Sequence, residues 1–294
     1  MGSIREMQMR INSVKSITQV TRALQTVSAS KVRKATQATE QTRPYAEHAL
    51  EILHDLAHQP GHYNLHPLLA VRTRVDSALV VLISSDRGLA GAFNINIVKF
   101  ALDFFKNAKI PIEYVTVGRK GRDMLYRQKK KIIADFSNIP SPPSFMDCAA
   151  IGNLIVNHFL EDKCDEVYLV YSHYVNMIRQ DPAVLKLLPM TLPAVSEEDK
   201  PHGKVRGVFT YEPDQSIVLE SIVPRFTALQ VYQAILSSQA SEHAARMLAM
   251  RNATDNGNEL IQYLQLEYNK ARQQNITTEM LDIVGGVEGM AKEE

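Results

Sequence analysis

The first sixty residues carry apolar side chains at intervals of three and four, a spacing typical of a long helix with a narrow apolar seam. The seam positions are Ile4, Met7, Ile11, Val14, Ile17, Val20, Leu24 and Val27. Ser3 and Glu6 form a capping-box pattern, which predicts that the helix begins at the start of the chain. Pro60 and Gly61 are expected to end it. The pattern therefore predicts a coiled-coil helix over residues 1–60.

The last segment, residues 211–294, again has helical spacing and contains no proline after Pro224. The seam spacing recurs in two groups, Ile261, Leu264, Tyr268 and Ala271, then Ile276, Met280, Ile283 and Val287. At about 1.5 Å per residue, each terminal helix could reach roughly 80–90 Å. Two such helices at opposite ends of the chain can pair with each other and form a shaft.

The middle segment, residues 74–210, alternates strand and helix patterns. The run "SALVVLISSD" is continuously apolar, which is typical of a strand buried on both faces of a parallel sheet. Strands are predicted over 77–86, 110–118, 164–175 and 203–214, and helices over 96–108, 120–130 and 144–163. The alternation predicts a doubly wound, Rossmann-like α/β domain between the two helices.

Charge changes this picture at the first helix. No acidic residue lies between Glu6 and Glu40. The same stretch contains six basic residues, Arg10, Lys15, Arg22, Lys31, Arg33 and Lys34. A solvated helix ordinarily mixes signs, because opposite charges one turn apart stabilise it. Since the whole chain has a formal net charge of only +1, the positive excess indicates a local partner rather than nucleic acid.

Cysteine usage and hydropathy exclude several classes of protein. The chain has two cysteines, Cys148 and Cys164, without a CxxC pair, which argues against a disulfide framework or a zinc knuckle. No apolar run approaches the length that spans a bilayer. The N-terminal residues do not read as a signal peptide, because charge begins at Arg5 and no apolar core follows. We therefore expect no direct membrane anchor.

The loop "SSDRGLAGAFN", residues 84–94, lies where α/β folds bind phosphates, between a strand and a helix. It has Gly88 and Gly91 but neither a three-glycine fingerprint nor a Gly-Lys-Ser/Thr sequence. A tight strand-to-helix turn capped by Asp86 explains it better than a nucleotide site. We expect no cofactor there.

Other polar clusters also have simple interpretations. The series His54, His58, His62 and His66 is interrupted by Pro60 and Gly61, so it favours a solvated helix end over a metal site. Asp162, Asp165 and Glu166 are consistent with a hydrated surface turn, and Lys129, Lys130 and Lys131 with a solvated face. No Ser/His/Asp, Cys/His or paired-carboxylate arrangement stands out. The sequence predicts no catalytic residues and no metal site.

Three blocks of sequence resemble the gamma-subunit family of rotary ATP synthases. They are "IREMQMRINSVKSITQVTRAL" with "VSASKVRKA", the turn "SDRGLAGAFN", and a C-terminal part with "YEPD", "QASEHAARMLAMRNATDN" and "LQLEYNKARQQNITTEMLDIVGGVEGM". The resemblance runs in the right order over essentially the full chain. The C-terminal block is the most specific part.

The resemblance implies an antiparallel coiled coil of the two terminal helices inside a hexamer of three alpha and three beta subunits. It implies that the α/β domain is a foot on the membrane ring of c subunits, beside the epsilon subunit. Membrane association would then be indirect, through the c ring. ATP chemistry would belong to alpha and beta, and this chain would transmit torque without catalysing a reaction itself.

The resemblance also assigns contacts. Residues expected to face an acidic lever segment of each beta subunit are Lys15, Arg22, Leu24, Lys31, Arg33 and Lys34. The basic contacts are best kept exposed and weak, about 0–1 kcal/mol each, because a tight ion pair would stall rotation. Residues expected to bond a beta catch loop are Arg272, Gln273, Thr277 and Glu279. Residues expected to touch the c ring are Phe209, Tyr211 and Glu212.

Two features depart from the family pattern. Ala90 and Ala92 stand where the family turn usually has a cysteine and a glycine, so the loop is expected to pack differently. The cysteine-bearing insertion of the chloroplast form is absent, which argues against a thiol switch. The start of the chain favours a peripheral protein on the cytoplasmic face of a bacterial plasma membrane, with a processed organellar chain as the alternative.

Two other classes of function stay open from the residues alone. One is an α/β nucleotide-binding enzyme with helical arms, which would bind a nucleotide tightly as an isolated chain. The other is a coiled-coil adaptor that holds a complex together without turning.

Overall fold

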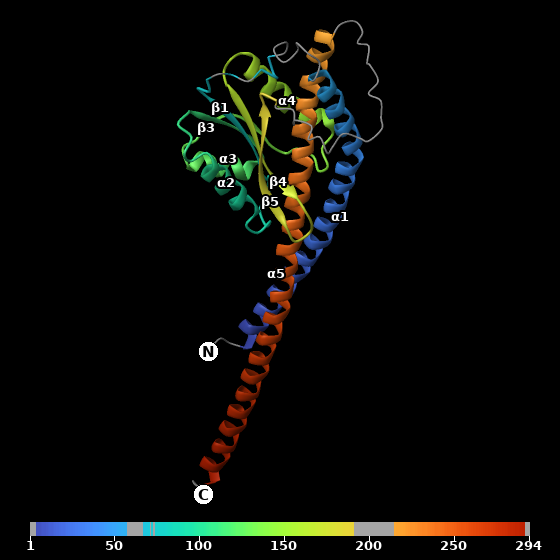
Figure 1. Ribbon diagram of the computed structural model, residues 1–294. Helices are drawn as coiled ribbons and strands as arrows, with labels where there is room; N and C mark the ends of the chain where they lie inside the picture. Colours follow the sequence, from blue (N-terminus) through green and yellow to red (C-terminus); the bar gives the residue numbers. More distant parts are fainter. Residues whose placement is uncertain (1–3, 58–66, 71, 73, 191–214, 292–294) are drawn as a thin grey trace. The chain divides into compact units, whose positions relative to one another are not determined.

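The structure of the chain, a computed structural model, describes residues 4–57, 67–70, 72, 74–190 and 215–291 (Figure 1). Helix α1 spans Ile4–Ala57 and helix α5 spans Gln215–Ala291, which confirms the two predicted long helices. The predicted helix start at Ser3, its end at Pro60 and the strand over 203–214 lie outside the described residues.

The chain divides into two compact units, and both long helices contribute to each. One unit contains Met1–Val27 with Met247–Glu294, and the other contains Ser28–Arg246. The boundaries predicted near residues 60, 74 and 211 fall within or next to residues that the structure does not describe, so they stay predictions.

The unit Ser28–Arg246 contains a five-stranded sheet with the order β3-β2-β1-β4-β5. The strands are β1 Ala78–Ile83, β2 Ile112–Val117, β3 Lys131–Phe136, β4 Glu166–Tyr174 and β5 Gln180–Leu188. The pairs β1–β2, β1–β4 and β2–β3 are parallel, whereas β4–β5 is antiparallel. Strands β1, β2 and β4 confirm the predictions over 77–86, 110–118 and 164–175. Strands β3 and β5, at the two edges, were not predicted.

The edge strands escaped the sequence analysis because each mixes polar and apolar residues. Pro182 lies inside β5, which is an edge strand among the described residues, and an edge strand tolerates proline because one side of its backbone need not donate to a neighbour. Lys131, expected on a solvated face, begins β3 and forms an ion pair with Glu113 of β2. Lys129, Lys130 and Lys131 are nevertheless all exposed, as predicted.

Helices cover both faces of the sheet, which confirms the doubly wound α/β prediction. On one face α2 (Phe93–Phe104) and α3 (Arg119–Arg127) pack over Val80 and Leu82 of β1. On the other, α4 (Phe145–Leu160) and the first part of α5 pack over Leu79 and Val81. Figure 1 shows α2 and α3 on the side of the sheet away from α5. All six residues of β1 are buried, as expected for the central strand.

In the other unit, α1 and α5 run antiparallel at close range. The hydroxyls of Thr21 and Thr254 lie 2.7 Å apart. Thr18 lies three residues before Thr21 on α1, and Gly257 lies three residues after Thr254 on α5. These two residues are also in contact, so a Cβ at Gly257 would collide with the Thr18 hydroxyl. The helices therefore approach through small residues, which brings their backbones close together.

The seam of α1 differs from the prediction at three of the four predicted positions after Val14. Ile17, Val20 and Val27 were expected to face a partner helix, but their side chains are 59%, 59% and 53% exposed. Among the buried or half-buried residues, a regular alternation of three and four connects Met7, Ile11, Val14, Thr18, Thr21, Gln25, Ser28, Val32 and Ala35, and the predicted seam residue Leu24 is half-buried as well. Burying Thr18 is tolerated because its hydroxyl donates to the Val14 carbonyl at 2.9 Å. A search for apolar residues alone misses such a seam.

The seam of α5 is confirmed in its first half only. Ile261, Leu264, Tyr268 and Ala271 are half-buried. Every residue over 272–285 is exposed, including the predicted seam residues Ile276, Met280 and Ile283, while the side chain of Val287 lies outside the described set. Among the described helices, none is long and apolar enough to cross a membrane.

Candidate functional site

The basic residues predicted to contact the beta levers fall in both units. Lys15 and Arg22 are exposed and lie two helical turns apart, on one face of α1. Leu24 is half-buried in the same unit. The charges at Lys15 and Arg22 are thus presented to solvent, as the lever interpretation requires.

In the other unit, Arg33 and Lys34 are exposed, but Lys31 is not fully so. Lys31 is half-buried, and its positive charge acts on Glu242 and His243 of α5. The expectation that all the basic residues would be freely exposed is therefore wrong for Lys31. Its charge contributes to an internal cluster.

The residues predicted to bond the catch loop lie in the exposed stretch of α5. Arg272, Gln273, Thr277 and Glu279 all have exposed side chains. The Thr277 hydroxyl donates to the backbone carbonyl of Gln273 at 2.9 Å. Arg272 and Glu279 are two turns apart on one helix face. The predicted c-ring residues Phe209, Tyr211 and Glu212 lie outside the described residues.

A buried ionic cluster joins α5 to the loop after β1. Arg246 Nη2 pairs with a Glu242 carboxylate oxygen at 2.7 Å, and both side chains are less than 15% exposed. The same guanidinium donates to the backbone carbonyls of Arg87 and Gly88 at 3.2–3.3 Å. One α5 side chain therefore holds the loop by its backbone, whatever side chains the loop carries.

His243 ties a second loop to the same cluster. Its Nδ1 accepts from Arg246 Nη1 at 3.1 Å, so Nε2 carries the proton and donates to Ser141 Oγ at 2.8 Å. Burial, together with the positive charges of Arg246 and Lys31, lowers the pKa of His243 to about 3. Burial raises the pKa of Glu242, and the pairing with Arg246 opposes that rise. The imidazole is therefore neutral at physiological pH.

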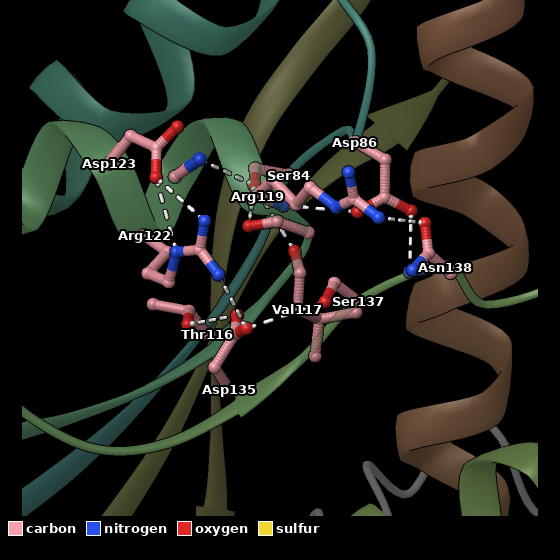
Figure 2. A network of polar contacts seen from close by, with 12 residues as sticks. Ser84, Asp86, Thr116, Val117, Arg119, Arg122, Asp123, Asp135, Ser137 and Asn138 are labelled. Atoms are coloured by element: carbon pink, nitrogen blue, oxygen red, sulfur yellow. Dashed lines mark hydrogen bonds and ion pairs between the residues drawn. The ribbon is translucent and has the colours of Figure 1, made fainter.

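Asp86 does not cap the helix that follows its loop, contrary to the prediction. Helix α2 begins after Ala92 without a side-chain cap. The Asp86 carboxylate instead accepts from the backbone N–H groups of Arg119, at 3.1 Å, and Asn138, at 2.9 Å (Figure 2). Since Arg119 opens α3, the carboxylate occupies the N-terminus of the neighbouring helix, a position that favours negative charge.

The ends of β1 and β2 meet in further hydrogen bonds at this carboxyl edge. Ser84 Oγ donates to the Val117 carbonyl at 3.1 Å and accepts from Gly121 N–H at 2.9 Å (Figure 2). Gly118 has φ +99°, and a Cβ there would meet the Ser84 carbonyl. N–H groups in the first turn of α3 thus bond to Asp86 and Ser84, so the loop after β1 holds the N-terminus of this neighbouring helix.

Beside them, Arg122 of α3 forms an ion pair with the edge strand β3. It pairs with Asp123 at 2.9 Å and with Asp135 of β3 at 3.0 Å, and Thr116 of β2 donates to Asp135 at 3.0 Å (Figure 2). These contacts fix α3 to the edge strand.

In the acidic patch before β4, Asp162 is exposed, as predicted for a hydrated turn, but Asp165 is a structural residue. The Asp165 carboxylate, 13% exposed, accepts from Arg72 at 2.8 Å and from the backbone N–H groups of Asp76 and Ser77 at 2.8 and 2.9 Å. Burial would raise the pKa of Asp165, but these donors together lower it. Asp162 pairs with the same guanidinium at 2.6 Å.

The described residues offer little chemistry for a cofactor. Among them, no group of three or more His, Cys, Asp or Glu side chains could hold a metal ion. Cys148 and Cys164 are buried, and burial raises the pKa of each thiol to about 12. Both thiols are therefore protonated and poor nucleophiles at neutral pH.

Comparison with known proteins decides the family. The ATP synthase family model matches residues 3–290. An ATP synthase gamma chain of Roseiflexus castenholzii is 40% identical over 297 residues, covering 99% of this chain and 100% of that protein. One from Dehalococcoides mccartyi is 42% identical over 292 residues, with the same coverage. The chain belongs to the ATP synthase gamma family.

Solved structures agree with this assignment. The central stalk and c-ring structure of the Tetrahymena thermophila mitochondrial ATP synthase contains a chain that aligns with a TM-score of 0.61 at 27% identity, covering 80% of this chain and 99% of that one. A chain of the Euglena gracilis mitochondrial ATP synthase aligns with a TM-score of 0.67 at 24% identity, covering 98% and 94%, and supports the fold alone.

The sequence analysis missed the cluster around Arg246 in this gamma-family chain. The only local signal was Glu242 four residues before Arg246, a spacing that favours an ion pair on any helix. Nothing local indicated that the pair would be buried, because the loop carbonyls of Arg87 and Gly88 lie more than 150 positions away.

Proposed function

We propose that this chain is the central rotor shaft of an ATP synthase, coupling rotation of a c ring to ATP synthesis or hydrolysis in an alpha/beta ring. The observation that carries the proposal is the full-length match to ATP synthase gamma chains at 40–42% identity. The antiparallel pairing of α1 with α5 supports it, because a paired shaft resists bending and twisting better than a single helix.

The partners follow from this role. Three alpha and three beta subunits would surround the helix pair, and the c ring and epsilon subunit would hold the α/β domain. Phe209, Tyr211 and Glu212 would touch the c ring. Membrane association would be indirect, on the cytoplasmic face of a bacterial plasma membrane. The chain itself would catalyse no reaction and hold no cofactor.

The exposed side chains support the assigned contacts. Lys15, Arg22, Arg33 and Lys34 would meet the acidic lever of each beta subunit in turn, with Lys31 and Leu24 beside them. Exposed ion pairs of about 0–1 kcal/mol each suit a surface that must slide past three equivalent partners.

The polar stretch of α5 is the other proposed contact. Arg272, Gln273, Thr277 and Glu279 would bond the catch loop of a beta subunit. This stretch is exposed on all sides of the helix, as expected where a partner rather than α1 surrounds it.

Co-expression with alpha and beta subunits tests the proposal. We expect a size-exclusion peak with three alpha, three beta and one copy of this chain, and ATP turnover well above that of alpha and beta alone. Elution of the chain by itself, with tight binding of a nucleotide, would overturn the proposal in favour of an α/β enzyme.

A further inference from the structure

A hollow opens at the amino edge of the sheet, where β2 and β3 begin and where α2 and α3 end. Its volume is about 410 Å³, within the range of roughly 300–1,000 Å³ that is typical of small-molecule sites. Leu102, Phe105 and Ile112 are among the apolar residues that line it. All of the lining residues belong to the α/β unit Ser28–Arg246, so the hollow is formed within one compact unit.

Tyr114 of β2 also lines the hollow, and its hydroxyl is unpaired. The side chain is only 1% exposed, and in the part of the chain that the structure describes its hydroxyl has no hydrogen-bond partner. Tyr168 on β4 faces the same side of the sheet, since both tyrosines pair with Val80, and its hydroxyl donates to Glu166 at 2.7 Å. A buried tyrosine hydroxyl ordinarily has such a partner, because an unsatisfied one is costly. A ligand in the hollow can supply the missing partner of Tyr114.

The hydroxyl of Tyr114 is available as a donor. Burial raises the pKa of Tyr114, so the phenol keeps its proton at neutral pH. It therefore suits a ligand that carries an acceptor oxygen, such as the oxygens of a phosphate or a carboxylate.

The charged residues around the hollow favour a negative ligand. Lys106 and Lys130 line it, are exposed and form no ion pair with any described residue. Their backbones are fixed, because Lys106 N–H donates to the Asp103 carbonyl at 3.3 Å and Lys130 N–H to the Leu125 carbonyl at 3.1 Å. Asp103 is the only acidic residue among those that line the hollow. Two unpaired ammonium groups thus face one carboxylate.

We propose that the hollow binds a small organic anion. The apolar body of the ligand packs against Leu102, Phe105 and Ile112, its phosphate or carboxylate group lies between Lys106 and Lys130, and the Tyr114 hydroxyl donates to one of its oxygens. A lysine ammonium acts as a point charge that suits such a group. A flat anionic surface such as a membrane can meet the lysines but not the buried hydroxyl. The site does not depend on the proposed rotor function.

Phenyl phosphate is the probe that tests the site, because it combines a small apolar body with a phosphate. Titration calorimetry with the full-length chain should give a dissociation constant of about 1 mM or lower. Inorganic phosphate, which lacks the apolar body, and phenol, which lacks the charge, should each bind at least about tenfold more weakly. Absence of binding of phenyl phosphate at about 10 mM would overturn the proposal.

Tyr114→Phe separates a ligand contact from a structural role. Without ligand, its free energy of unfolding should equal or exceed that of the wild type, because the hydroxyl that it removes has no partner. Its affinity for phenyl phosphate should fall about tenfold. A loss of stability would show that the hydroxyl has a partner within the chain, and unchanged affinity would show that it does not touch the ligand. Either result would contradict the proposal.

Charge variants test the other half of the site. Lys106→Gln with Lys130→Gln should weaken the binding of phenyl phosphate about fivefold, whereas Asp103→Asn should strengthen it. The matched control is Lys34→Gln with Lys120→Gln, which removes the same charge from two exposed residues that do not line the hollow. We expect the control to bind as the wild type does. Equal losses in the two double variants would mean that only net charge matters, and the site would then be wrong.

Vesicles distinguish a free ligand from a lipid headgroup. We expect the chain not to sediment with phosphatidylglycerol vesicles. Sedimentation that depends on Lys106 and Lys130 but not on Tyr114 would indicate a membrane surface, and it would contradict a site for a free small molecule.

Discussion

Among single residues, Arg246 makes the most distant contacts, because its guanidinium bonds two side chains of α5, Glu242 and His243, and two backbone carbonyls of a distant loop. Breaking a buried ion pair leaves an uncompensated charge, which typically costs about 3–5 kcal/mol. The cluster therefore fixes the position of the loop after β1 on α5. His243 belongs to the same cluster and gives it a measurable pH dependence.

The neutral state of His243 predicts loss of stability in mild acid. In the unfolded chain its pKa takes the ordinary value of 6.5, whereas in the folded chain it is about 3. Between these values only the unfolded state binds the proton. The free energy of unfolding should therefore fall as the pH drops below about 6.5, by up to about 1.4 kcal/mol per pH unit from this group. Above that range the group contributes no dependence.

Denaturant unfolding at pH 7.5 and 5.5 checks this for the wild type and for His243→Gln. The variant should lose less stability between the two pH values, because Gln does not titrate. Glu242, whose raised pKa acts in the opposite direction, is present in both proteins, so their difference isolates His243. The same pH dependence in both would show that His243 is not the titrating group.

At the scale of elements, the contact of α1 with α5 depends on size more than on hydrophobicity. Thr18, Thr21 and Thr254 are at least half-buried in it, and Gly257 lies directly against Thr18. Thr254, like Thr18, donates its hydroxyl to a carbonyl of its own helix, at 2.9 Å. The polar atoms are thereby satisfied while the helices stay close.

Because α1 and α5 lie close together at Gly257, a glycine-to-alanine substitution should have opposite effects on stability at Gly257 and at Gly285. Gly257→Ala adds a methyl group that collides with Thr18, so the helix pair should lose about 1–3 kcal/mol of stability, offset in part by the higher helix propensity of Ala. Gly285→Ala meets nothing within 4 Å and should be neutral or stabilising. Thermal unfolding followed by circular dichroism at 222 nm compares them. Equal changes of stability in the Gly257→Ala and Gly285→Ala variants would contradict the close contact of Gly257 with Thr18.

At the scale of the whole molecule, most of the proposed contact residues lie outside the buried surfaces that stabilise the chain. The basic residues Lys15, Arg22, Arg33 and Lys34 and the stretch of α5 over 272–285 are exposed. Lys31 is the exception, since its charge also acts on the internal cluster. A test of the lever surface should therefore leave Lys31 in place.

Charge reversal at Arg33 and Lys34 should lower coupled ATP synthesis without unfolding the chain. Both side chains are exposed, so replacing each with Glu should change folding stability by less than about 0.5 kcal/mol. The acidic lever of a beta subunit, however, would attract Arg33 and Lys34 and would repel the two glutamates that replace them. The matched control is Arg127→Glu with Lys129→Glu. Both residues are exposed and lie between the end of α3 and the start of the edge strand β3. Proton-driven synthesis in reconstituted vesicles is the readout. Unchanged coupling in the Arg33 and Lys34 variant would contradict the lever assignment.

The sequence by itself determined the two long helices, the buried strands β1, β2 and β4, and the one-signed charge of α1. Each of these is written in a local pattern: helical spacing, a continuous apolar run, or the absence of acidic residues. The family resemblance added the candidate contacts with partners.

Only the tertiary structure decided the edge strands, the seam through Thr18 and Ser28, the partner of Asp86 and the burial of Arg246. Edge strands such as β5 need pair only one neighbour, so their sequence is weakly constrained. Thr18 is a seam residue because Gly257 stands opposite it, and Thr21 because it faces Thr254. Asp86 and Arg246 bond groups far away in sequence, and local periodicity contains no information about such contacts.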